Sequence, residues 1–136
     1  MTPPTITSAT TGTFTATIDG SDFIAARVNI YSDADDVHHF SGSMGSELPN
    51  DDFQSIYITT KKDVENGSHT YPKGIDTLVC ITKKGQITDK AKISEGTCTV
   101  DFDKATQHFK MSFDVMADYP PNLRLHIEGS FDLTSS

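Results

Sequence analysis

The chain has 136 residues, a size at which one domain can bury roughly two-thirds of the surface of its unfolded chain. Its 11 Lys and Arg stand against 19 Asp and Glu, which gives a formal net charge of -8. This sign of charge argues against a nucleic-acid partner or an anionic membrane surface, because both require clustered positive charge. No apolar run approaches the ~20 residues of a membrane span, so membrane insertion is not expected either.

The compartment stays open at the level of sequence. Residues Met1–Pro4 have neither the basic start nor the apolar run of a signal peptide, and we therefore expect no signal peptide in this chain. Cys80 and Cys98 do not settle the question. Both lie in apolar, strand-like runs, where a disulfide and two buried thiols fit the spacing equally well.

Period-two alternation rich in Thr, Val, Ile and Phe dominates the chain, and no long stretch has the spacing of an amphipathic helix. The first strand is predicted over residues 13–19, where apolar residues alternate with threonines. Asp19-Gly20 then predicts a hairpin turn, because Asp-Gly accepts the positive φ angles of a tight turn. The second strand is predicted from Phe23 to Tyr31.

Further strands are predicted at regular intervals, separated by turns rich in Gly, Asn, Asp and Pro. They span residues 37–43, 53–60, 75–82, 87–93, 97–103, 108–117 and 122–133. The run 87–93 is polar and suits a sheet edge, because edges tolerate lysines. About eight or nine short strands predict an all-β fold, an antiparallel β-sandwich, with a small β-barrel as the alternative.

We expect a single β-sandwich domain over residues 1–136, with loosely held ends at about 1–10 and 134–136. The alternation also predicts which side chains form the core. These are Phe14, Ile18, Val28, Ile30, Ile56, Ile58, Val100, Phe102, Phe109, Met111, Phe113, Leu125 and Ile127.

An acidic residue or a threonine, followed by a glycine, a hydroxyl residue and an apolar residue, occurs three times, at Gly12, Gly96 and Gly129. We expect these glycines to permit a bulge or a close approach of two backbones where a strand bends. Chance recurrence among Thr-rich strands is the alternative.

The segment from Gly12 to Gly20 reads GTFTATIDG and is followed by Phe23 and two alanines. It resembles the opening strand and turn of small uncharacterised bacterial β-sandwich proteins. The closing GSFDL, from Gly129 to Leu133, is similar to their final strand. The resemblance covers about a fifth of the chain. It implies a bacterial β-sandwich and carries over no active site.

No catalytic motif stands out. The chain lacks a Gly-x-Ser-x-Gly elbow, a phosphate loop, a dinucleotide fingerprint and a His-Glu-x-x-His pair. Scattered Ser, His and Asp residues do not by themselves form a triad. We therefore expect no catalytic residues and no enzymatic activity.

The histidines lack the paired spacing of zinc ligands. His38 and His39 are adjacent, so in a strand their side chains point to opposite faces. His108 and His126 alternate with apolar residues and should lie on the solvent side of their strands. We expect solvated surface histidines rather than a zinc site.

An acidic run with Asp33, Asp35 and Asp36 is the candidate metal site. Calcium takes six to eight oxygen ligands, and carboxylates spaced by one residue on a loop can supply several of them. Calcium is thus the one cofactor that the sequence suggests. The alternative is a solvated acidic turn, because Asp is an ordinary turn former and the run lacks the Gly and the distal Glu of an EF-hand.

Tyr71 and Tyr119, each followed by a proline, are the candidate ligand-binding residues together with His69. Tyrosine beside proline gives a stiff, half-apolar surface with a hydrogen-bonding tip. Such rings also plug the ends of sandwiches. The predicted function is a non-catalytic binding or interaction module for an unknown protein or glycan partner. The alternatives are a small β-barrel carrier of an apolar ligand and an acidic inhibitor or immunity-type protein for a basic partner.

Overall fold

A computed structural model describes residues 10–32, 37–46, 48–61, 63–119 and 123–135. The described strands are β1 (Thr10–Ile18), β2 (Ser21–Ile24), β3 (Arg27–Ser32), β4 (His38–Gly45), β5 (Phe53–Thr60), β6 (Gly67–Thr70), β7 (Ile75–Lys84), β8 (Ile87–Asp103), β9 (His108–Tyr119) and β10 (Leu123–Ser135). The predicted all-β class is confirmed, with ten strands in place of the expected eight or nine. Among these residues no helix has the length and apolar character needed to cross a membrane.

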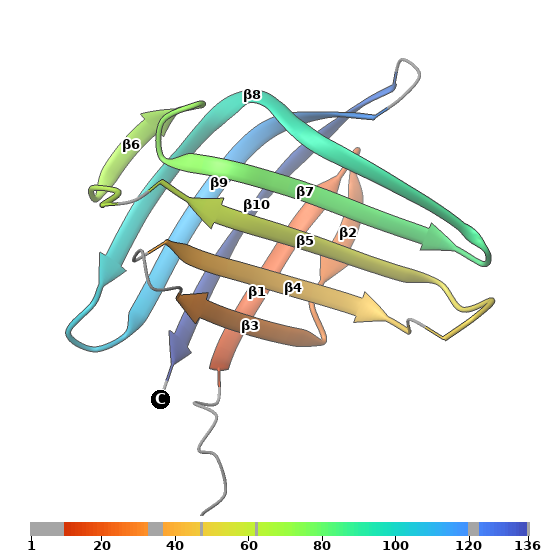
Figure 1. The fold of residues 1–136 in the computed structure, drawn as a ribbon, viewed down its shortest axis with the longest axis horizontal. Helices are drawn as coiled ribbons and strands as arrows, with labels where there is room; N and C mark the ends of the chain where they lie inside the picture. Colours follow the sequence, from red (N-terminus) through yellow and green to blue (C-terminus); the bar gives the residue numbers. More distant parts are fainter. Residues whose placement is uncertain (1–9, 33–36, 47, 62, 120–122, 136) are drawn as a thin grey trace, which may run out of the picture.

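The described strands form one antiparallel sheet in the order β2-β1-β10-β9-β8-β7-β5-β4-β3, and β6 pairs with β8 beside this path. The sheet curls into a half-barrel, so that β3, β4, β5 and β7 cross over β1, β8, β9 and β10 as a second layer (Figure 1). This architecture corresponds to the barrel alternative, because the two layers belong to a single sheet.

The two ends of the sheet meet at the second predicted strand, which the structure divides into β2 and β3. β2 pairs with β1, and β3 pairs with β4. Between them, the amide of Ala25 donates to the carbonyl of Phe14 over 2.9 Å, and the amide of Ala26 donates to the carbonyl of Ser43 over 2.8 Å. The strand is interrupted because its hydrogen bonding passes from one layer to the other at these two alanines.

Residues 87–93 and 97–103 were predicted as two strands but form the single long strand β8. Its first part, residues 87–91, pairs with β7 alone among the described strands, which confirms the predicted edge character. The register against β9 shifts between Ile93 and Glu95. Gly96 follows with a φ of 142°, and a Cβ there would lie 2.5 Å from the carbonyl oxygen of Asp114. The expected close approach of backbones is confirmed at this glycine.

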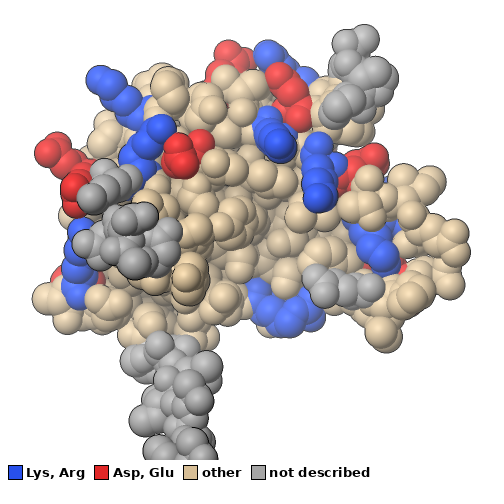
Figure 2. All heavy atoms as spheres, viewed as in Figure 1, with Lys and Arg blue, Asp and Glu red and all other residues tan. Residues whose placement is uncertain are grey.

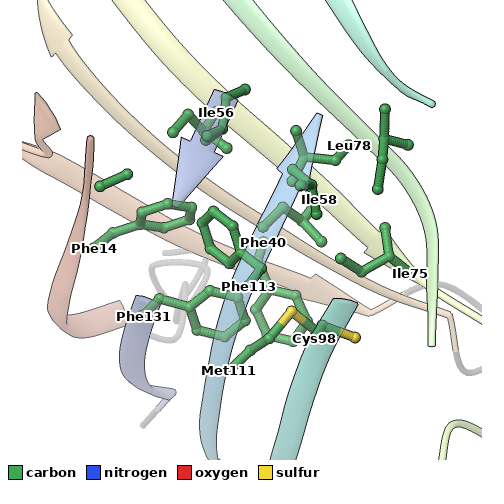
Figure 3. Close-up of a cluster of buried hydrophobic side chains, with 14 of the residues drawn as sticks. Phe14, Phe40, Ile56, Ile58, Ile75, Leu78, Cys98, Met111, Phe113 and Phe131 are labelled. Carbon is green, nitrogen blue, oxygen red and sulfur yellow. The ribbon is translucent and has the colours of Figure 1, made fainter. Parts of the chain in front are cut away.

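The core lies between the two layers and is dominated by phenylalanine. Seven of the eight phenylalanines are buried. Phe40 stacks on Phe131 with ring centroids 4.5 Å apart, and Figure 3 shows these rings beside the aliphatic side chains of β5 and β7. All predicted core residues are buried except Val28, Ile30 and Leu125, which are partly buried and pack against the core.

Charge is unevenly distributed over the outside. On the outer face of β3, β4, β5 and β7 the charged side chains lie mainly toward the margin, around an uncharged centre (Figure 2). Ser41, Tyr57 and Val79 are cross-strand neighbours there. On the outer face of the other layer, β9 and β10 carry exposed carboxylates at alternate positions, including Asp114 and Glu128.

Candidate functional site

At one end of the half-barrel the layers separate and enclose a cleft of about 400 Å³. Its apolar lining consists of Ile18, Cys80, Ile87, Ala91, Tyr119 and Leu125. Its polar lining consists of Asp19, Ser21, Gln54, Thr82, Lys84 and Asp89. The volume falls within the roughly 300–1,000 Å³ of small-molecule sites, which commonly combine an apolar wall with a few polar groups.

One wall of the cleft is the hairpin of β7 and β8, which extends to the side of the molecule in Figure 1. Three cross-strand pairs point into the cleft from this hairpin, Cys80 with Ala91, Thr82 with Asp89, and Lys84 with Ile87. They share one face because side chains alternate along a strand. Cys80 and Ala91 are buried, whereas Asp89 and Lys84 are exposed. The wall therefore changes from apolar at its base to mainly polar at the mouth.

The opposite wall comes from the ends of β1, β9 and β10. Tyr119 and Leu125 are partly buried and pack against the core, and Ile18 is buried. The turn after β1 is held in place by Asp19, whose carboxylate accepts the amide of His126 over 2.8 Å and whose own amide donates to the carbonyl of His126 over 2.8 Å. These bonds fix the rim of the cleft to β10.

Burial controls the chemistry of the cleft floor. Burial raises the pKa of the Cys80 thiol to about 11, and a hydrogen bond with Thr82 only partly opposes this effect. The thiol is therefore protonated at neutral pH and is a weak nucleophile. At the mouth, the side chains of Lys84 and Asp89 form no hydrogen bond or ion pair with any other described residue. Both side chains are available to a ligand.

The candidate binding residues do not lie together. Tyr119 lines the cleft. The amide of Tyr71 donates to the carbonyl of Gly96 over 2.9 Å, and Gly96 pairs with Val115. Val115 lies four residues from Tyr119 on β9, which corresponds to about 13 Å along a strand. Tyr71 is partly buried against the core beside the bend of β8.

His69 lies on β6, near Tyr71 in the chain, and its Nε2–H donates to the carbonyl of Glu65 over 2.6 Å. Asp33, Asp35 and Asp36 lie outside the described residues, so the calcium site stays a prediction.

Cys80 and Cys98 are both buried and are not joined in a disulfide. Of the two alternatives left open by their spacing, the structure has the pair of buried thiols.

A second hollow, of about 680 Å³, lies on the outer face of β1 and β10. It is shallow, and hydroxyl side chains such as Thr15, Thr17 and Ser130 line it beside the exposed Ile24. We favour the cleft as the ligand site because a concave, partly apolar cavity removes more of a small ligand from water.

The cleft was not predicted from the sequence, although one feature of the sequence is related to it. The inward-facing positions from Thr82 to Asp89 carry Thr, Lys and Asp beside the single apolar Ile87, whereas inward positions elsewhere on these strands are apolar. Polar residues on the core face of a hairpin indicate that the hairpin extends past the layer opposite. That signal appears only once the inward face is known.

Comparison of the chain with protein-family models, with curated proteins and with solved structures found no match. The resemblance of the GTFTATIDG segment to small bacterial β-sandwich proteins stays a prediction.

Proposed function

We propose that the chain is a non-catalytic binding module that holds a small molecule with an apolar body and a polar end in the cleft between β7–β8 and β9–β10. The observation that carries this proposal is the gradient of the β7–β8 wall. Cys80 and Ala91 offer an apolar floor, and Lys84 and Asp89 offer charged groups without partners in the described chain at the mouth. A ligand with an apolar body and a polar end can contact the apolar floor and the charged mouth at the same time.

The chemistry of the cleft supports binding rather than catalysis. General acid–base or nucleophilic catalysis needs a titratable group or a nucleophile poised near neutral pH. The cleft is lined by no histidine among the described residues. Its one thiol, Cys80, has a pKa raised to about 11 by burial, which disfavours the reactive thiolate.

The proposal is tested with N-phenyl-1-naphthylamine, a neutral apolar dye whose fluorescence rises when it leaves water. We expect saturable binding of one dye per native chain. Leu125→Asp places a charge on the apolar wall and should weaken dye binding at least about tenfold, or about 1.4 kcal/mol. The matched control is Ile24→Asp, because Ile24 is 65% exposed and lies outside the cleft.

Circular dichroism and melting temperature establish that both variants are folded. Dye binding that is absent from the native chain, or that falls equally in the two variants, would contradict the proposal. Because Leu125 packs against the core, Thr82→Asp is a second cleft variant should Leu125→Asp fail to fold.

A further inference from the structure

Two histidine–aspartate pairs lie on the outer face of β9 and β10. The cleft lies on the opposite face of the sheet. His126 Nε2 lies 2.5 Å from Asp114 Oδ1, and His108 Nε2 lies 2.5 Å from Asp132 Oδ1. In each pair the imidazole N–H donates to the carboxylate of the neighbouring strand. The surroundings of the two pairs differ in charge.

At the His108 pair the carboxylate faces a lysine. Asp132 is directly opposite Lys110 across β10 and β9, and Lys110 is opposite Asp101 on β8. This arrangement places opposite charges next to one another, as stable cross-strand pairs require.

At the His126 pair the carboxylate faces a second carboxylate. Asp114 is directly opposite Glu128, and the outer neighbours of this row are Thr17 and Thr97. Like charges directly opposite each other are destabilising in a sheet. The nearest arginine, Arg124, is already engaged with Asp118 and Glu95 over 3.0 Å each. Two facing carboxylates thus have one imidazole and no Lys or Arg beside them in the described sheet.

The three side chains converge. His126 and Glu128 are two residues apart on β10 and therefore share a face, and Asp114 meets them from β9. One ligand atom from each residue lies within 4.8 Å of the others. A zinc ion with bonds of about 2.0–2.2 Å holds its ligand atoms about 3.4 Å apart, a distance that rotation of the exposed Glu128 side chain can provide.

We propose that Asp114, His126 and Glu128 form a surface site for a divalent transition-metal ion of the zinc class. Zinc takes imidazole nitrogen and carboxylate oxygen as ligands, and an open zinc site has three protein ligands and a water molecule in the fourth position. The ion takes the place of the Nε2 proton that is hydrogen-bonded to Asp114, and the neutral ring then carries its one proton on Nδ1. A small hollow of about 190 Å³ beside Asp114 and Glu128 leaves room for water or another donor in the remaining position.

The test is isothermal titration of untagged, chelator-treated chain with zinc chloride at pH 7.5. We expect one zinc per chain. His126→Ala and Glu128→Gln should each weaken binding at least about tenfold, because each removes one of three ligands. His108→Ala is the matched control, since it removes the other His–Asp pair from the same face and should change the zinc affinity less than twofold.

A second measurement shows that the metal is at this site. Zinc should shift the imidazole resonances of His126 in NMR spectra of the native chain and leave those of His108 in place. Absence of zinc binding by the native chain, binding that survives both ligand variants, or an equal loss in His108→Ala would overturn the proposal. The result is independent of the cleft, because dye binding and zinc binding involve opposite faces of β10.

Discussion

The two ends of the half-barrel are built from the same strands but are packed in opposite ways. At one end, Phe40 contacts Phe102, Phe109 and Phe131 with ring centroids 4.5–5.6 Å apart. At the other end, the inward positions of the same β8 are Ile87, Asp89 and Ala91, and they line the cleft. The first is a filled end and the second is an open end.

The difference shows how one curled sheet can separate stability from binding. Aromatic rings, each of which buries a large apolar area, fill the space between the layers at the filled end. Smaller and polar side chains at the open end leave about 400 Å³ unfilled. Substitutions should therefore affect folding at the first end and ligand binding at the second.

The largest expected effect comes from phenylalanine itself, which occurs at both ends. Phe40 is fully buried, and Phe40→Ala should lower the free energy of unfolding by about 3–5 kcal/mol. Phe53 is only partly buried beside the open end, and Phe53→Ala should cost about 1 kcal/mol. Urea unfolding of the two variants measures the difference. Equal costs would mean that the open end is packed as tightly as the filled end.

The Cys80 thiol gives a pH-dependent test of the floor of the open end. Its pKa is 9.0 in an exposed thiol and is raised by burial to about 11 in the folded chain. Below pH 9 the Cys80 thiol is protonated in both the folded and the unfolded chain, so its burial makes its full contribution to the free energy of unfolding. Between pH 9 and 11 only the unfolded thiol ionises, so stability falls by up to about 1.4 kcal/mol per pH unit.

The measurement is the free energy of unfolding of the native chain minus that of Cys80→Ala, at pH 8, 9 and 10. The titration of Lys and Tyr cancels in this difference, and the cavity left by alanine adds a constant. A difference that does not change with pH would show that water reaches the thiol and that the floor is not dry.

The filled end could be predicted from the sequence better than the open end, for a physical reason. Alternation in a strand marks which side chains turn inward, and Phe109, Met111 and Phe113 follow that rule. The alternation does not indicate how far one hairpin extends past another. That distance decides whether the inward side chains of the hairpin pack against the opposite layer. Phe40 and Phe131 were both missed, because Gly42 and two histidines weaken the alternation of β4 and Gly129 interrupts that of β10.

The candidate site illustrates the same limit. Tyr119 was selected because proline follows it, and it lines the cleft. Tyr71 was selected on the same ground, and it lies beside the bend of β8. The cluster of Asp114, His126 and Glu128 depends on the register of β9 against β10, and no spacing within one strand reveals a partner on the next.

The two tyrosines differ in their position, because Tyr119 lines the cleft and Tyr71 lies outside it. Tyr119→Ser removes a ring from the wall of the open end and should weaken binding of the naphthylamine dye about tenfold, or about 1.4 kcal/mol. Tyr71→Ser removes a ring outside the cleft and should leave the dye affinity within about twofold. Fluorescence titration of both folded variants measures this. A loss in Tyr71→Ser as large as that in Tyr119→Ser would place the binding surface elsewhere.

The smallest expected effect on folding comes from the lip of the cleft. Ile87 and Leu48 are each 67% exposed, and only Ile87 lines the cleft. Serine at either position should change the free energy of unfolding by no more than about 0.5 kcal/mol, because neither side chain is well buried. Ile87→Ser should nevertheless lower dye affinity several-fold, since a bound apolar body would cover this side chain, whereas Leu48→Ser should not. Equal dye affinities in the two variants would show that the ligand does not reach the lip and that Lys84, the cross-strand partner of Ile87, does not contact it.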